Sequence, residues 1–492
     1  MTSQTRFDFR QDLFDYPCQD FKRHLQTDGN SRILFSGKFG IGKSFFLDHF
    51  FIPKVQVTVL SDVKYEAFHI FPVNYSIASN EDIFRYIKYD VIITMLSKEI
   101  KLDYNDFSYL ESIPSFLKGN LLKTLATLIY MIPKVGKPVY ESYQKLEELN
   151  KEFLKHHESI KEPEGAKLTS FIERIENKEG SLFENDIISA IIQNVLHRRK
   201  IETQKENVLI IDDLDRIDPE HVFRLLNVFA AHFDNPNGLA NKLGFDKVII
   251  VCDIKNIRNI FKAKYGSDTD FNGYIDKFYS IDVYNFDNRE VLLNISLEAF
   301  RNVLIHGLRD HELDLYKRNS AGSLAYELLQ LFIANSFVSL RTLKNRIDYQ
   351  TEVDARKYIK FNDLSTIEPA RFPVFIHFKI LKEIVGGYDV VKDLISRVNS
   401  QSFLVENMNK YSNFLLFFLN YKSTFRAKGF ATIFFNGQRL NYPVTANAEK
   451  DANNAIVFQV MGGNENKQYD YTLDEFRMLL LEFIDLLKRV DN

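Results

Sequence analysis

One glycine-rich segment constrains the fold of this chain more than any other. Residues 37–44 read Gly-Lys-Phe-Gly-Ile-Gly-Lys-Ser and fit the pattern G-x-x-x-x-G-K-[ST]. A short apolar run, residues 33–35, precedes the segment, and a helical pattern begins at Phe45. A strand, a glycine-rich loop and a helix in this order form a cradle of backbone N–H groups around an anion. The segment therefore predicts a phosphate-binding loop at the carboxyl end of a strand.

Each part of this loop has a chemical role in binding a nucleoside triphosphate. The glycines permit unusual backbone angles and leave room for the anion. Lys43 neutralises oxygens of the β and γ phosphates, and the Ser44 hydroxyl is a ligand for Mg²⁺. ATP with Mg²⁺ is the expected ligand. The expected binding residues are Gly37, Lys38, Phe39, Gly40, Ile41, Gly42, Lys43, Ser44 and Phe45.

A second motif carries carboxylates at the end of another apolar run. Residues 208–211 are Val-Leu-Ile-Ile, and Asp-Asp-Leu-Asp-Arg follows them. An apolar strand that ends in carboxylates places acid beside a metal-bound phosphate. We expect Asp212 to hold Mg²⁺ through water, together with Ser44, and Asp213 to polarise the attacking water. Asp215 is the next candidate for the base. Taken alone, the motif could instead be an acidic turn after a strand.

The two motifs lie too far apart in the sequence to belong to neighbouring strands joined by one helix. A sizeable insertion must lie between them, and the charged, mostly helical stretch over about residues 100–200 is the candidate. A further apolar strand is expected at residues 248–251. Strands that alternate with helices indicate a parallel sheet flanked by helices.

The second motif resembles the KAP family of P-loop NTPases, which is related to the AAA+ and STAND classes. A further match is Tyr-Ile-Asp-Lys-Phe at residues 274–278, which is similar to the family's Tyr-Leu-Glu-Lys-Ile segment. The similarity covers about residues 15–350. It implies an additional-strand ATPase core followed by a helical lid. Family members carry inserts between the two motifs, often with membrane-spanning helices, and the insertion here matches in place and size without a convincing span.

The resemblance also implies roles for several charged residues. Asp253 would be a sensor of the γ-phosphate or the water, although an Asp here is equally suited to capping the next helix. Arg341 would be a second sensor in the lid, the alternative being an exposed lid residue. Arg216 closes the second motif, where it either pairs with Asp215 or reaches a nucleotide in the next subunit as an arginine finger. Arg224 is another finger candidate.

The expected fold class is α/β: a parallel P-loop NTPase sheet with a helical insertion and a helical lid, plus a small α+β module. After residue 285 the pattern is helical to about residue 422. The expected domains are a core over residues 1–284, a lid over 285–355, a helical region over 356–422 and the α+β module over 423–492.

The carboxyl-terminal module has its own local signals. Asn436-Gly437 between two apolar runs predicts a type I′ hairpin with strands over residues 430–435 and 438–442. A further strand over residues 455–461 and a closing amphipathic helix over residues 473–490 complete the prediction.

Composition bears on location and partners. The two cysteines lack metal-ligand spacing and favour a reducing compartment, and the charged amino terminus is no secretory signal, so a cytoplasmic protein is expected. The apolar run at residues 121–132 is too short to span a bilayer and predicts a buried helix, with a membrane-peripheral segment as the alternative. A net charge of −3 gives no support to nucleic-acid binding.

Three functions follow from these motifs. The first is an oligomeric ATPase that acts with a protein effector encoded nearby, in a bacterial antiviral defence system as the resemblance implies. The second is a nucleotide-dependent switch that does not hydrolyse ATP and recruits an effector. The third is a nucleic-acid motor, which the near-neutral charge disfavours.

Overall fold

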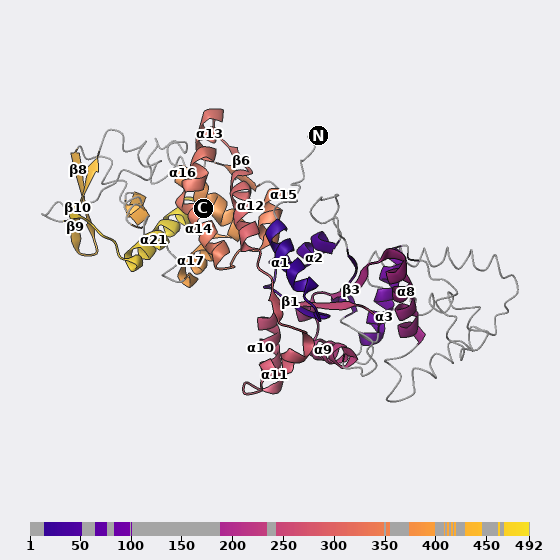
Figure 1. Ribbon diagram of the computed structural model, residues 1–492. Coiled ribbons are helices and arrows are strands. Elements are labelled where there is room, and N and C mark those ends of the chain that lie inside the picture. Colours follow the sequence, from indigo (N-terminus) through magenta and orange to yellow (C-terminus); the bar gives the residue numbers. More distant parts are fainter. Residues whose placement is uncertain are drawn as a thin grey trace. The chain divides into compact units, whose positions relative to one another are not determined.

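The computed structural model describes most of the chain apart from the long insertion. The described residues are 14–51, 64–75, 83–98, 100, 187–233, 243–348, 351–354, 373–398, 408, 411–412, 415–416, 418–419, 429–444, 461–462 and 467–491. They fall into two compact units, which are described separately (Figure 1). The first unit covers residues 14–39 and 43–287, and the second covers residues 288–492 together with Gly40–Gly42.

A five-stranded parallel sheet forms the centre of the first unit. Its strands are β1 (Arg32–Ser36), β2 (Tyr65–Ile70), β3 (Glu206–Ile211), β4 (Lys247–Cys252) and β5 (Val283–Asn285), in the spatial order β2-β3-β4-β1-β5. The strand β4 therefore separates β1, which leads into the glycine-rich loop, from β3, which leads into the acidic motif. This is the additional-strand arrangement, and it brings the carboxyl ends of all five strands to one edge of the sheet, where ligands of such folds bind.

Helices cover both faces of this sheet. On one face, alternate strand residues pack with α3 (Ile83–Ser97), α8 (Ile187–Thr203), α9 (Pro219–Phe233), α10 (Ile254–Tyr265) and α11 (Phe271–Ile275) in one apolar core. On the other face, α1 (Asp15–Gln26) and α2 (Lys43–Phe51) contribute an aromatic cluster. There the ring of Phe35 in β1 lies 5.2 Å from Phe21 and 6.0 Å from Phe46. Strands buried on both faces explain their continuous apolar runs.

The second unit is largely helical. Its helices are α12 (Arg289–Arg301), α13 (Asp310–Asn319), α14 (Leu324–Ala334), α15 (Leu340–Asp348), α16 (Pro373–Val385), α17 (Tyr388–Arg397) and α21 (Leu473–Asp491). The expectation of continuous helix from residue 285 to 422 is wrong at two places. The strands β6 (Val303–His306) and β7 (Thr351–Asp354) form a parallel pair. Each strand has only four residues and lies between helices. Such a short run does not show a clear alternating pattern in the sequence.

The carboxyl-terminal hairpin is present as expected. The strands β8 (Gly429–Phe435) and β9 (Gln438–Val444) pair antiparallel. Asn436 and Gly437 between them have φ of 46° and 76°, the signs that a type I′ turn requires. Two short strands, β10 (Met461–Gly462) and β11 (Lys467–Gln468), extend this sheet.

Several predictions fall on residues outside the described part. These are residues 100–186 of the insertion apart from Ile100, including the apolar run at 121–132, and residues 455–460 of the expected last strand. Within the described residues, no helix combines the length and the apolar character that a membrane span requires.

Candidate nucleotide-binding site

The glycine-rich loop lies at the carboxyl end of β1, as the sequence predicts. The Gly37 N–H donates to the Cys252 carbonyl of β4 at 3.0 Å, so the loop begins between these two strands. Gly40 and Gly42 have φ of 78° and 100°, angles that L side chains rarely adopt. The loop therefore folds in a conformation that its glycines make possible.

Lys43 points into this loop. Its Nζ donates to the Gly37 carbonyl at 2.7 Å and lies 3.3 Å from the Lys38 carbonyl. The residue is 8% exposed although it begins α2. An ammonium held over the amino end of a helix is placed to meet phosphate oxygens.

The middle of the loop packs within the second unit. The Leu340 N–H donates to the Gly40 carbonyl at 3.1 Å, and the Asn288 side-chain amide donates to the Ile41 carbonyl. A Cβ atom added to Gly40 would lie 3.0 Å from the Ser339 Cβ. The backbone angle therefore favours glycine at position 40, and the approach of Ser339 leaves little room for a side chain.

Asp212 directly follows β3 at the same edge of the sheet and is fully buried. Its Oδ1 accepts from the Asp213 N–H at 2.7 Å, its Oδ2 lies 3.0 Å from the His69 Nε2, and the Ser44 hydroxyl also hydrogen-bonds to it. Burial raises the pKa of Asp212, but the hydrogen bonds and the nearby His69 outweigh burial and lower it. The carboxylate therefore stays ionised at neutral pH.

The donors present fit a magnesium ion. Ser44 lies in the first turn of α2 and Asp212 directly follows β3, and their side chains are hydrogen-bonded although they lie far apart in the sequence. A hydroxyl and a carboxylate are hard oxygen donors of the kind that Mg²⁺ prefers, and Mg²⁺ completes its shell with water and phosphate oxygens. The contact between these two side chains supports the predicted metal-binding pair.

Asp213 and Arg216 form an ion pair in the same chain. Asp213 has a left-handed backbone with φ of 56°, and its Oδ2 lies 2.8 Å from the Arg216 Nη1. The Arg216 guanidinium also lies 5.8 Å from the ring centre of Phe39, a loop residue that is 59% exposed. The local partner of Arg216 is thus Asp213 and not the expected Asp215, because the left-handed turn brings the Asp213 carboxylate to Arg216.

Asp215 lies near both Lys43 and Asp253. Burial raises the pKa of Asp215, the charge of Asp253 adds to this, and Lys43 opposes it. The Asp253 side chain accepts from the Lys255 N–H at 3.0 Å and from the Asn256 N–H at 3.4 Å, so it caps α10. The capping role of Asp253 is confirmed, and its position at the end of β4 stays compatible with a sensor.

The remaining predicted residues lie on helices. Phe45 in the first turn of α2 has its ring 5.8 Å from Phe14. Arg224 is exposed on α9, in the first unit. Arg341 is exposed on α15, in the second unit, directly after Leu340.

The structure adds one residue that the sequence analysis missed. His69 in β2 lies 2.9 Å from Asp48 through Nδ1 and 3.0 Å from Asp212 through Nε2. Burial is the largest single influence on its pKa and lowers it, but hydrogen bonds and charges of the two carboxylates together raise the pKa to about 9. A polar residue within the apolar strand Ala67-Phe68-His69-Ile70 was the available signal.

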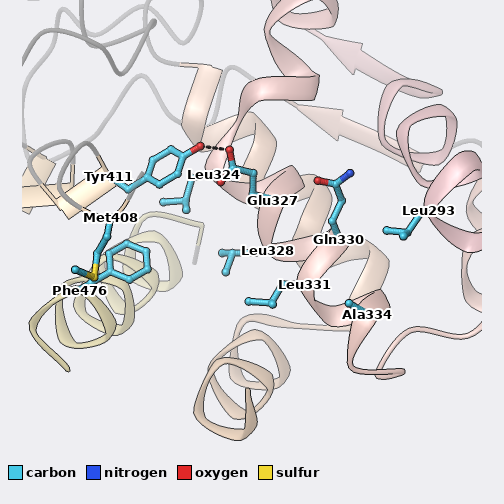
Figure 2. A pocket seen from close by; sticks show the side chains of 10 residues that line it. All are labelled: Leu293, Leu324, Glu327, Leu328, Gln330, Leu331, Ala334, Met408, Tyr411 and Phe476. Carbon is cyan, nitrogen blue, oxygen red and sulfur yellow. Dashed lines mark hydrogen bonds between the residues drawn. The ribbon is translucent and has the colours of Figure 1, made fainter. Parts of the chain in front are cut away.

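A separate groove of about 310 Å³ lies in the second unit (Figure 2). It is mostly apolar, and the Tyr411 hydroxyl donates to the Glu327 carboxylate at its edge. Its lining residues are Leu293, Leu324, Glu327, Leu328, Gln330, Leu331, Ala334, Met408, Tyr411 and Phe476. None of these ten lining residues is a lysine or an arginine, so they offer a phosphate no cationic side chain.

Comparison with known proteins gives one match. A family model described as the KAP family P-loop domain matches residues 26–349. No curated protein and no solved structure matches the chain. The matched range contains the loop, the acidic motif and Arg341.

Proposed function

Because the chain belongs to the KAP family of P-loop domains, we propose that it binds ATP with Mg²⁺ and hydrolyses the β–γ phosphoanhydride. Nucleotide binding and hydrolysis are the properties of P-loop NTPases as a class. The proposal of Mg²⁺-dependent ATP hydrolysis rests on the positions of Lys43, Ser44 and the buried Asp212 at one edge of the sheet. This set supplies a cation for phosphate and oxygen donors for a metal.

Binding would use the loop and the start of α2. The N–H groups of residues 37–45 and the amino end of the helix favour a triphosphate. Lys43 would exchange its hydrogen bonds with the loop carbonyls for contacts with β and γ oxygens. Ser44 and Asp212 would hold Mg²⁺, Asp212 through water, and the ion would neutralise charge on the β and γ oxygens.

Hydrolysis needs a base beside the γ-phosphate. In the proposed step the water oxygen attacks the γ-phosphorus, the water proton passes to the Asp213 carboxylate, and the bond to the β-phosphate oxygen breaks to release ADP. The Arg216 guanidinium competes with this proton for the Asp213 carboxylate, so the ion pair opposes the step. Asp215 is the second candidate, because its raised pKa makes it a stronger base. Asp253 and Arg341 would sense the γ-phosphate.

Titration calorimetry tests the binding part of the proposal. Wild type should bind a non-hydrolysable ATP analogue with Mg²⁺, and Lys43→Ala should lose this binding, because the loop loses its buried cation. A charged hydrogen bond of this kind contributes about 1.5–3 kcal/mol or more. Unchanged affinity in Lys43→Ala would contradict the assignment of the loop.

We further propose that ATP promotes a homo-oligomer in which an arginine of one subunit reaches the nucleotide of the next. Arg216 is engaged by Asp213 within its own chain, which favours exposed Arg224 as the finger. A protein effector encoded nearby and a role in bacterial antiviral defence are proposals that the family resemblance alone supports.

The ion pair between Arg216 and Asp213 favours a second candidate function. If Arg216 stays on Asp213 with ATP bound, the candidate base remains neutralised. The chain would then be an ATP-dependent switch that recruits an effector without turnover. ATP binding without phosphate release at any protein concentration would support this alternative.

A further inference from the structure

His69 connects three elements of the first unit. It belongs to β2, its Nδ1 lies 2.9 Å from Oδ1 of Asp48 in α2, and its Nε2 lies 3.0 Å from Oδ2 of Asp212 at the end of β3. The helix α2 begins with Lys43 and Ser44. One side chain thus links the helix that follows the loop to the carboxylate of the acidic motif.

The orientation of the imidazole ring is fixed from three sides. Asp48 and Asp212 bind its two nitrogens, and the ring of Phe71 stacks on it at 4.4 Å with an angle of 28° between planes. The His69 side chain is 10% exposed and Asp212 is fully buried, whereas Asp48 is 57% exposed. The arrangement therefore has a solvent-facing end at Asp48 and a buried end at Asp212.

The orientation of Asp212 depends on the donors around it. A carboxylate offers about four acceptor positions, and its terminal torsion has a broad, two-fold energy profile. The Asp213 N–H donates to Oδ1 of Asp212, while the His69 Nε2 hydrogen-bonds to Oδ2. Without His69, Oδ2 would lose that donor, and the carboxylate would be free to rotate away from the position in which it meets Ser44.

We propose that His69 is a positioning residue for Asp212, and that Asp48 in turn orients His69. The inference deepens the proposed function, on which it rests: His69 acts on the metal-dependent part of nucleotide binding through Asp212. It predicts that loss of His69 weakens the gain in nucleotide affinity that Mg²⁺ provides.

The test is calorimetric binding of a non-hydrolysable ATP analogue, once with Mg²⁺ and once with EDTA. We expect His69→Leu to lower the Mg²⁺-dependent gain by about tenfold, the lower end of what loss of an outer partner of a metal ligand costs. His69→Gln should retain part of the gain, because its amide can still donate to Asp212. Asp48→Ala should cause a smaller loss than His69→Leu.

The double variant of Asp48→Ala and His69→Leu shows whether Asp48 acts on Asp212 through His69 or whether the two residues affect Mg²⁺-dependent binding independently. If Asp48 acts only through His69, the double variant loses no more than His69→Leu alone. His24→Leu is the matched control, because His24 is also mostly buried, at 14% exposure, and lies 3.4 Å from the exposed Asp282. It should leave the Mg²⁺-dependent gain at the wild-type value.

An unchanged Mg²⁺-dependent gain in folded His69→Leu would overturn the inference. If His69→Leu does not fold, an unchanged gain in both His69→Gln and Asp48→Ala overturns it equally, since Asp48 is exposed. The wild-type measurement distinguishes a wrong role for His69 from a wrong proposed function. A wild type that binds no nucleotide contradicts the function, whereas a Mg²⁺-dependent wild type with unaffected variants contradicts only the role of His69.

Discussion

The Arg216 Nη1 lies 2.8 Å from the Asp213 Oδ2, so the cation that closes the acidic motif neutralises the carboxylate expected to activate water. Asp213 is partly exposed and Arg216 is 45% exposed, so this ion pair can open at little cost. If Asp213 is the base, as we propose, this ion pair within the chain restrains it. Its opening would be a step that precedes hydrolysis.

Arg216→Ala tests this restraint. We expect the variant to hydrolyse ATP faster than wild type at low protein concentration, because Asp213 loses its competing cation. Steady-state phosphate release measures the effect, with Arg216→Lys as the control that keeps the charge. A turnover that falls in Arg216→Ala and recovers in Arg216→Lys would instead make Arg216 a positive contributor to catalysis.

Gly42→Ala should impair nucleotide binding. Gly42 has φ of 100°, and a Cβ atom there would lie 2.5 Å from the Leu340 Cδ2. A side chain at this angle destabilises the loop conformation by more than about 1 kcal/mol. Calorimetry with the ATP analogue should show the loss. Gly322→Ala is the control, since no atom lies within 4 Å of its added Cβ, and equal affinities in the two variants would contradict the argument.

Mixed variants test assembly. We expect ATP to promote a homo-oligomer and turnover per subunit to rise with protein concentration. An arginine supplied by a neighbouring subunit can accelerate phosphoryl transfer by about 10³–10⁵. Lys43→Ala and Arg224→Ala should each be inactive, while their mixture should regain activity, because the intact Arg224 of a Lys43→Ala subunit completes its neighbour's site. A monomer with ATP and Mg²⁺ in mass photometry would contradict this proposal.

Because His377 is buried, we expect the free energy of unfolding to fall in acid. His377 lies in α16, with its ring 4.9 Å from Tyr316, and burial lowers its pKa to about 3 although the Tyr316 backbone opposes this. Because the folded-state pKa lies below the unfolded value of 6.5, the stabilisation is complete above pH 6.5 and is lost as pH falls towards 3. Each pH unit in this window costs up to about 1.4 kcal/mol.

Denaturant unfolding of the second unit at pH 7 and pH 5 measures this loss. His377→Phe should remove it, since Phe does not titrate. An equal drop in the free energy of unfolding in the variant would assign the acid sensitivity to other groups.

Local sequence patterns predicted the loop and the acidic motif, whereas the contacts that they missed join residues far apart in the sequence. The loop and the acidic motif each follow an apolar strand, so the sequence predicts both. His69 was missed because its partners Asp48 and Asp212 lie 21 and 143 residues away. The pairing of Arg216 with Asp213 depends on the left-handed backbone of Asp213, which the sequence alone did not indicate.

Asparagine substitutions at Asp212 and Asp213 should distinguish nucleotide binding from hydrolysis. Asp212→Asn should weaken the Mg²⁺ dependence of binding, because the amide lacks the charge that holds the metal-bound water. Asp213→Asn should bind ATP as wild type does and lose turnover by about 10²-fold or more, since general base catalysis contributes about 10²–10⁴. Calorimetry and phosphate release on the same samples check both outcomes. Intact hydrolysis in both variants would direct attention to Asp215.

ATP hydrolysis at this site is tested most directly by phosphate release from ATP by purified wild type, Lys43→Ala and Asp213→Asn, measured with Mg²⁺ and with EDTA over a range of protein concentrations. We expect Mg²⁺-dependent release by wild type, loss of both binding and release in Lys43→Ala, and loss of release alone in Asp213→Asn. Release that is equal in all three proteins, or that persists in EDTA, would contradict this expectation.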